Sequence, residues 1–337
     1  MSPNNTSPET GGWLKYAGIG LAVFIILWII DLLPLFFGIL IPYIAVLTFI
    51  IGFIAKVIKW ARSPVPFRIT TTCGQQKTLP WIKSDNLESP HTTMGVIGRM
   101  ALEILFFRSL FRNTSTDLTS GKRLVYWPNL WLWLAGLAFH WCFLVIVLRH
   151  LRFFMEPVPG FVHFIQNLDG MFQVGVPVFY MSSAIILASL AFLFARRIFD
   201  AKIRYISLPA DYFALVLLLA IVISGILTRH VFKADIVEVK KLAVGLLTLR
   251  PSMPGEIGFW FYLHLFCLSA LLAYFPFSKL MHFPGVFLSP TRNMTANSRE
   301  FRHVNPWNYP VKVHTYEEYE DEFRDKMKAA GMPLEKE

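Results

Sequence analysis

The sequence is poor in charged residues, and this scarcity argues against a soluble enzyme. Only 16% of the 337 residues are charged, against about 25% in a typical soluble domain. Together with 55% hydrophobic residues and a mean hydropathy of +0.49, this composition predicts a membrane protein. The net charge of +10 does not point to nucleic acid, because the basic residues adjoin long apolar runs, where Lys and Arg hold loops in the cytoplasm. We therefore expect no nucleic-acid partner.

Cysteines are also scarce, and they are too far apart to share a metal ion. Cys73, Cys142 and Cys267 have neither zinc-site nor iron–sulfur spacing. The sequence lacks C-x-x-C-H, so any haem would be held by coordination alone, as in b-type cytochromes. No H-E-x-x-H motif, acidic cluster or inverted repeat supports a metalloenzyme or transporter interpretation.

Long apolar runs, in contrast, are abundant, and a run of about 20 residues can cross a bilayer. Six segments qualify: Trp13 to Leu33, Leu35 to Lys59, Asn129 to Leu151, Met171 to Ala195, Pro209 to Arg229 and Ile257 to Phe277. The first has no clear small-residue cleavage site, so we expect a retained helix and not a signal peptide. The predicted fold is all-α, a polytopic transmembrane bundle of about six helices.

Loop charges predict the orientation of this bundle. Lys and Arg concentrate between residues 61 and 128 and again between 196 and 204, so both loops should be cytoplasmic, with both termini on the same side. The segments Arg152 to Gly170 and Val231 to Glu256 should then lie outside. The second of these carries four Lys and Arg residues, which weakens the rule there.

Two amphipathic stretches do not span the membrane. Thr92 to Arg112 has an apolar helical stripe, typical of an interfacial helix or a partner-docking helix. In the tail, Thr315 and Glu318 form a capping box and Gly331 is a stop signal, so we expect a helix that docks a cytoplasmic subunit or stays loosely held. The predicted organisation is 1–60 two N-terminal transmembrane helices, 61–128 cytoplasmic loop, 129–284 four-helix haem-binding core, and 285–337 cytoplasmic tail for partner docking.

Four histidines form two pairs on the third and sixth predicted spans. His140 and His150 are 150 − 140 = 10 residues apart, about 15 Å along a helix. His264 and His282 are 282 − 264 = 18 apart, about 27 Å and on one face. Antiparallel packing would set His150 opposite His264 and His140 opposite His282. Helix tilt and a kink near Pro276 must absorb the difference in spacing.

Paired imidazoles inside hydrocarbon favour bis-histidine haem, which passes electrons without an open coordination position. Arg149, Arg152 and Arg229 are candidate partners for haem propionates, or they are ordinary interfacial side chains that reach the membrane surface. A histidine proton relay in a transporter and a buried metal site remain alternatives at this stage.

The stretch from Phe259 to His282, FWFYLHLFCLSALLAYFPFSKLMH, resembles the last helix of the haem b subunit of respiratory nitrate reductase, the gamma subunit. The resemblance covers about Pro42 to Pro284. It implies two haem b groups. His150 with His264 would hold the outer haem, and His140 with His282 the inner one.

An extra first helix, the run L-E-I-L-F-F-R-S-L-F-R-N and the long tail resemble the cytochrome b subunit of Dsr/Hme-type complexes of sulfur metabolism. This resemblance implies a menaquinol-oxidising electron-transfer subunit in a prokaryotic cytoplasmic membrane. Its expected partners are a cytoplasmic iron–sulfur subunit related to heterodisulfide reductase, and other membrane and periplasmic subunits. A nitrate-reductase-type gamma subunit, a haem-free membrane anchor and a proton-coupled transporter are the alternatives.

The quinol site is the least defined part of this interpretation. The resemblance implies quinol beside the outer haem, with a basic side chain about twenty residues after the outer ligand, where this chain has Gly170. Quinol oxidation needs a proton acceptor. The candidates on the same side are His163, His230, Asp169 and Glu156, each of which can equally be an ordinary polar residue of an outer loop.

Overall fold

The computed structural model describes residues 16, 18–24, 33–63, 65, 68, 74–119, 123–252, 257–300 and 314–336. Helices dominate it, which confirms the predicted all-α class. In chain order its elements are α2 (Leu33–Leu35), η1 (Phe36–Leu40), α3 (Ile41–Ala61), α4 (Thr93–Phe106), α5 (Arg108–Phe111), β1 (Thr114–Thr119), β2 (Arg123–Pro128), α6 (Leu130–His150), η2 (Leu151–Phe153), α7 (Gly160–Asp169), α8 (Met181–Phe199), α9 (Ala201–Ile206), α10 (Pro209–His230), α11 (Ile236–Leu247), α12 (Phe259–Tyr274), η3 (Phe275–Phe277), η4 (Lys279–Met281), α13 (His282–Leu288) and α14 (Tyr316–Ala329).

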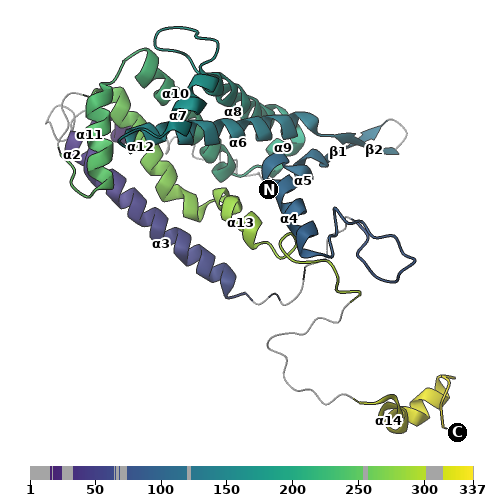
Figure 1. Cartoon of the computed structure of the whole chain (residues 1–337). Coiled ribbons are helices and arrows are strands. Elements are labelled where there is room, and N and C mark those ends of the chain that lie inside the picture. Colours follow the sequence, from purple (N-terminus) through teal and green to yellow (C-terminus); the bar gives the residue numbers. More distant parts are fainter. Residues whose placement is uncertain are drawn as a thin grey trace, which may run out of the picture. The chain divides into compact units, whose positions relative to one another are not determined.

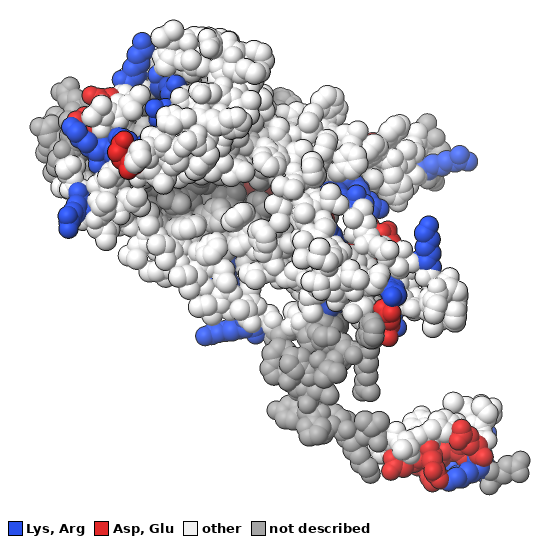
Figure 2. Space-filling model, viewed as in Figure 1, with Lys and Arg blue, Asp and Glu red and all other residues white. Residues whose placement is uncertain are grey.

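Helices of the described chain are long and apolar enough to cross a membrane at five places. These are Phe36–Ala61, Leu130–Phe153, Met181–Phe199, Pro209–His230 and Phe259–Phe277. They match five of the predicted spans. The predicted first span, Trp13 to Leu33, lies mostly outside the described residues. Figure 2 shows few charged side chains on the visible face of the helical bundle, and most of these lie near its ends. The fold is thus a multi-pass membrane bundle.

One predicted boundary is wrong. The fourth predicted span was to begin at Met171, but α8 begins at Met181. Gly175 has a positive φ of 79°, and the proline at 177 has no backbone N–H to give a helix. Hydropathy does not register these backbone constraints, so the apolar run looked continuous.

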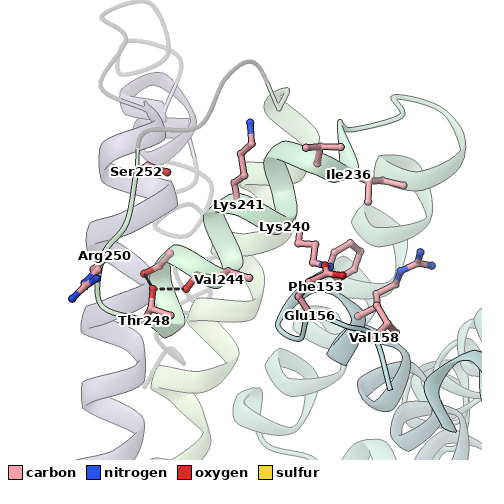
Figure 3. A pocket seen from close by; sticks show the side chains of 13 residues that line it. Phe153, Glu156, Val158, Ile236, Lys240, Lys241, Val244, Thr248, Arg250 and Ser252 are labelled. Atoms are coloured by element: carbon pink, nitrogen blue, oxygen red, sulfur yellow. Dashed lines mark hydrogen bonds and ion pairs between the residues drawn. The ribbon is translucent and has the colours of Figure 1, made fainter. Parts of the chain in front are cut away.

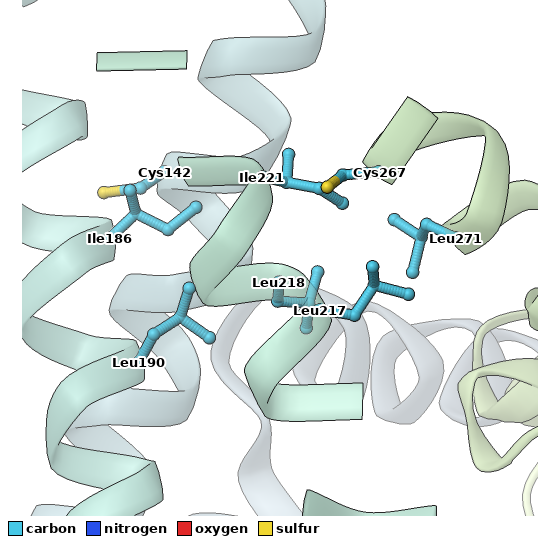
Figure 4. Packing of buried hydrophobic residues seen from close by; sticks show 8 residues of the cluster. All are labelled: Cys142, Ile186, Leu190, Leu217, Leu218, Ile221, Cys267 and Leu271. Atoms are coloured by element: carbon cyan, nitrogen blue, oxygen red, sulfur yellow. The ribbon is translucent and has the colours of Figure 1, made fainter. Parts of the chain in front are cut away.

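Each spanning helix packs on the next in the order α6, α8, α10, α12, α3. Figure 1 shows these helices running side by side. A buried cluster joins four of them, and Figure 4 shows Ile186 and Leu190 of α8 facing the leucines of α10. Its members are Cys142, Ile186, Leu190, Leu217, Leu218, Ile221, Cys267 and Leu271. The two cysteines are free and buried, and serve as small apolar side chains.

The last span breaks at the predicted position. α12 ends at Tyr274, and the short turn η3 contains buried Pro276. Ser278 then adopts an extended backbone before η4 and α13. A side chain at Gly52 of α3 would lie 2.7 Å from the Pro276 ring, so glycine permits the close approach of α3 to this break. His282 therefore does not continue the helical face of His264.

Two short helices lie in the loops predicted to be outside, and neither was predicted. α7 follows Pro159, and α11 is capped by Asp235, whose carboxylate accepts from the backbone N–H of Val237 at 2.8 Å. The signal for α11 was available, because Asp235 and Glu238 have the spacing of an N-terminal cap. Its buried residues Val239 and Leu242 also repeat at helical spacing.

The segment before α6 contains α4, α5 and an antiparallel hairpin. The helix predicted over Thr92 to Arg112 is present but interrupted at Phe107, which has a left-handed backbone with φ of 50°. Strands β1 and β2 pair in the register Thr114 with Pro128. The hairpin was not predicted, and it is the exception to the helical fold among the described elements.

The chain divides into two units, and the second comprises residues 64–99 and 289–337. In it, buried Arg68 donates to the carbonyls of Glu88 and Thr291, each at 3.2 Å. Burial, followed by the nearby charge of Arg99, lowers the pKa of Arg68. In the tail, α14 begins with the predicted capping box of Thr315 and Glu318.

Candidate functional site

The structure brings His140 and His282 together. His140 lies on α6, and His282 is the first residue of α13. Their ring centroids are 5.9 Å apart, and the ring planes are nearly perpendicular at 84°. Two aromatic rings, those of Phe107 and Phe139, contact His140 edge-on at 4.8 Å. The break at Pro276 thus places a histidine from beyond α12 against α6.

The other two histidines lie near each other as well. His150 ends α6, and His264 lies near it on α12. His150 is exposed, and His264 is half-buried. A side chain at Gly225 of α10 would lie 3.1 Å from Cε1 of His264. The missing side chain lets α10 approach the ring.

Backbone carbonyls hold three of the imidazoles by the same nitrogen. Nδ1 of His140 lies 2.7 Å from the carbonyl oxygen of Gly136, one helical turn earlier. Nδ1 of His150 has the same distance to the carbonyl of Ile146. In His282 the partner is the carbonyl of Lys279, at 2.9 Å. A carbonyl only accepts, so each Nδ1 carries the proton.

His264 reaches the same state through a hydroxyl group. Its Nδ1 lies 3.0 Å from Oγ of Ser224, and this hydroxyl donates to the carbonyl of Ile221 at 3.1 Å. The Ser224 oxygen is then free to accept from Nδ1–H. Nε2 of all four histidines makes no hydrogen bond with a described residue, and it is the nitrogen left with a lone pair.

These four side chains fit two bis-imidazole haem sites. A metal-bound imidazole usually donates its second nitrogen to a carbonyl or another acceptor, which fixes the ring and its tautomer. Two pairs of imidazoles whose Nδ1 is held by an acceptor meet this requirement. In the part of the chain that the structure describes, no group of three or more His, Cys, Asp and Glu side chains gathers.

Two of the three predicted arginines, Arg149 and Arg229, come together near His150. Arg149 is buried and forms an ion pair with Asp169, at 3.1 Å between Nε and Oδ2. Arg229 lies against the ring of Tyr180, which Arg149 also contacts. Arg152 is apart from them and donates to the side-chain oxygen of Gln166 at 2.8 Å.

The candidate quinol residues do not share one site. Asp169 is buried in its ion pair with Arg149. The ring of His230 packs on Phe179 with a centroid distance of 5.1 Å, and His163 is exposed on α7. Glu156 is the one of the four that lines a cavity.

This cavity of about 690 Å³ lies between η2 and α11 (Figure 3). Its lining residues are Arg152, Phe153, Glu156, Val158, Ile236, Val237, Lys240, Lys241, Val244, Gly245, Thr248, Arg250 and Ser252. Phe153 connects it to the histidines, because its ring centroid is 5.7 Å from that of His150. Lys240 forms an ion pair with Glu156 across the cavity. The cavity therefore combines apolar walls with a charged pair near the outer histidines.

Sequence reasoning missed the contribution of α11 to this cavity. Lys241 also lines it, and a hydrogen bond to Glu238 raises the pKa of Lys241. Lys241 thus stays protonated at neutral pH and cannot accept a proton there. In the sequence, Lys240 and Lys241 counted only as positive charges in a loop predicted to lie outside the membrane.

Fold and site together define a polytopic membrane protein that presents paired imidazoles between opposed helices. Residues 96–301 match the family model described as nitrate reductase gamma subunit, and the chain belongs to this family. It is 48% identical over 278 residues to a protein of Archaeoglobus fulgidus, covering 80% of this chain and 83% of that one. It is 43% identical over 273 residues to a protein of Archaeoglobus profundus, covering 79% and 81%. Both relatives are named "Hdr-like menaquinol oxidoreductase cytochrome b-like subunit".

Proposed function

We propose that this chain is the dihaem cytochrome b subunit of a respiratory complex that oxidises menaquinol near the outer membrane face. Electrons pass inward to a cytoplasmic iron–sulfur partner related to heterodisulfide reductase, in dissimilatory sulfur or sulfate metabolism. The names of the two relatives support three parts of this proposal: menaquinol as the substrate, a cytochrome b as the type of subunit, and a complex related to heterodisulfide reductase. The proposal includes a prokaryotic cytoplasmic membrane, cytoplasmic termini, further membrane and periplasmic subunits, and the domain organisation predicted above.

The observation that carries this proposal is that all four imidazoles have the same tautomer, with the proton on Nδ1. His140 with His282 would hold one haem, and His150 with His264 the other. Each protonated Nδ1 has an acceptor, so each Nε2 is prepared for iron. Haem held this way supplies one-electron transfer without an open coordination position.

We place quinol in the cavity between η2 and α11. Its apolar wall suits a quinone ring, and Phe153 lies between the cavity and His150. Oxidation of a quinol releases two electrons and two protons. The Glu156 carboxylate is the proton acceptor, because it lines the cavity and its side chain is 73% exposed to water. A proton taken up there can leave to the outer solution, and the second proton passes to water.

Glu156→Gln tests this placement in membranes that contain the complete complex. We expect haem reduction by menadiol, a soluble menaquinol analogue, to slow by about 10²-fold, the scale of one general base. Dithionite should still reduce both haems. Lys233→Gln is the control, because Lys233 is exposed and does not line the cavity. Unchanged menadiol rates in both Glu156→Gln and Lys240→Met would rule out this cavity.

The alternative functions differ in their optical spectra. A haem-free membrane anchor and a proton-coupled transporter give no reduced-minus-oxidised b-type signal, whereas a dihaem cytochrome does. The proposal predicts that the signal disappears in a quadruple alanine variant of His140, His150, His264 and His282. Electron transfer to a nitrate reductase partner, and none to a heterodisulfide-reductase-like one, would instead support a nitrate-reductase-type gamma subunit.

A further inference from the structure

Two guanidinium groups lie against one buried aromatic ring beside the outer histidines. Cζ of Arg149 is 3.7 Å from the ring centroid of Tyr180, and Cζ of Arg229 is 4.6 Å from it. Nη2 of Arg229 also donates to the Tyr180 hydroxyl at 3.2 Å. Tyr180 and Arg149 are buried, and Arg229 is half-buried. The ring faces attract the cations.

One carboxylate belongs to this cluster, and both its oxygens are in use. Oδ1 of Asp169 accepts from the backbone N–H of Ser182 at 2.7 Å. Oδ2 accepts from the Ser182 hydroxyl at 2.6 Å and lies 3.1 Å from Nε of Arg149. Nη2 of Arg149 donates to the same hydroxyl at 3.2 Å. Asp169 therefore neutralises Arg149, and it forms no ion pair with Arg229.

The charges of this cluster do not balance. Among the described residues, no carboxylate lies within ion-pair distance of Arg229. The Nε atoms of Arg149 and Arg229 are both buried without a hydrogen-bond acceptor in that part of the chain. For Arg149, the ion pair with Asp169 supplies charge but not hydrogen-bond geometry. A buried guanidinium N–H without an acceptor is costly, and the preferred partner of such a group is an oxyanion that can accept from both arms.

The excess charge lies beside a candidate haem ligand. Arg149 directly precedes His150 on α6, and Arg229 lies against the same Tyr180 ring as Arg149. We propose that these arginines form an oxyanion clamp for a carboxylate of the haem that His150 and His264 hold. Tyr180 is the positioning residue that keeps the two guanidiniums side by side. This inference rests on the proposed function, and a phospholipid headgroup is the other source of the same anionic chemistry.

Redox titration of the purified complex tests the clamp through haem potential. Removing a positive charge beside a haem favours its oxidised form, so Arg229→Gln should lower the midpoint potential of one haem and leave the other unchanged. Tyr180→Phe keeps the ring but loses the hydroxyl that Arg229 contacts, and it should shift the same haem by less. Lys233→Gln removes an exposed charge from the following loop and should change neither potential.

Three outcomes distinguish failure of the clamp from failure of the proposed function. Wild-type potentials in both Arg229→Gln and Tyr180→Ala, at full haem content, would overturn the clamp while leaving the dihaem function intact. A shift that disappears when anionic phospholipid is replaced by neutral lipid would also overturn it, in favour of a headgroup. Wild-type complex without any haem would end the proposed function itself.

Discussion

The four candidate ligands share one chemical state, although they come from different local structures. His140 and His150 use the carbonyl four residues earlier in their own helix. His282 uses a turn carbonyl, and His264 uses a serine of another helix. Each arrangement places the proton on Nδ1 and leaves Nε2 without a hydrogen bond to a described residue. Tautomer and ring orientation are thereby set before any iron binds.

Ser224→Ala should weaken the outer site, because it removes the acceptor that fixes the His264 tautomer. Loss of such a partner typically costs 10- to 100-fold in metal affinity, so we expect substoichiometric haem and a shifted spectrum for one haem. Ser269→Ala is the matched control. Ser269 is also buried, but its hydroxyl donates to the carbonyl of Leu265 on its own helix. Equal haem content in the two variants would contradict the role of Ser224.

Gly225→Ala should also act on the outer site, by sterics alone. The added carbon would lie 3.1 Å from Cε1 of His264, closer than ordinary contact, so the imidazole must move. We expect loss of the outer haem signal with the inner signal retained, measured by difference spectroscopy. Gly160→Ala should leave both haem signals unchanged, because nothing lies within 4 Å of its added carbon. Full retention of both signals in Gly225→Ala would show that α10 can move away from His264.

The histidines could be found from the sequence because a titratable side chain in an apolar run is conspicuous. The residues that support them could not. Ser224 and Gly225 are ordinary in a membrane helix, and their role depends on which helix lies opposite. Tyr180 and Lys240 acquire their roles only when separate loops fold together.

Among the elements, the segment α4–α5 has a defined place against α6. The indole N–H of Trp133 donates to the carbonyl of Phe106 at 2.8 Å, and that of Trp141 to the carbonyl of Leu105 at 3.0 Å. Between these bonds and α5 lies Phe107, whose left-handed backbone costs about 1 kcal/mol or more. This conformation turns the Phe107 ring onto His140. The strained residue thus lies at the inner candidate site.

Phe107→Ala should disturb the inner haem and spare the outer one. It removes an edge-on aromatic contact worth about 1 kcal/mol, so we also expect a lower thermal midpoint in detergent. Phe106→Ala provides the comparison, since its side chain is 56% exposed and its carbonyl remains available to Trp133. Identical spectra for the two variants would mean that Phe107 does not position His140.

Hydropathy predicted the spanning elements well, because burial in lipid and burial in protein both select apolar residues. It failed where backbone geometry determines the first residue of a helix, and where a short helix is amphipathic. α8 begins ten residues later than predicted, 181 − 171 = 10, after a glycine and a proline that cannot be helical there. α7 and α11 are short and interrupted by polar side chains, so they were interpreted as loops. The hairpin β1–β2 lies among residues without a long apolar run.

Across the whole bundle, the packing order explains how the histidines meet. α6 and α12 are joined through α8 and α10 and not by direct close packing. Yet His140 reaches His282 within 5.9 Å, so the series of helices curves until its histidine-bearing members face each other. The sequence suggested antiparallel pairing, but an ideal helix would have misplaced His282. The break after Tyr274 resolves the mismatch between spacings of 10 and 18 residues.

The central claim is that four histidines form two separate ligand pairs. The most direct test is a potential-resolved reduced-minus-oxidised spectrum of the complete complex with each histidine replaced by alanine in turn. The account predicts that His140→Ala and His282→Ala remove the same b-type signal, and that His150→Ala and His264→Ala remove the other. Any variant that keeps both signals, or a loss shared between His140→Ala and His264→Ala alone, would contradict it.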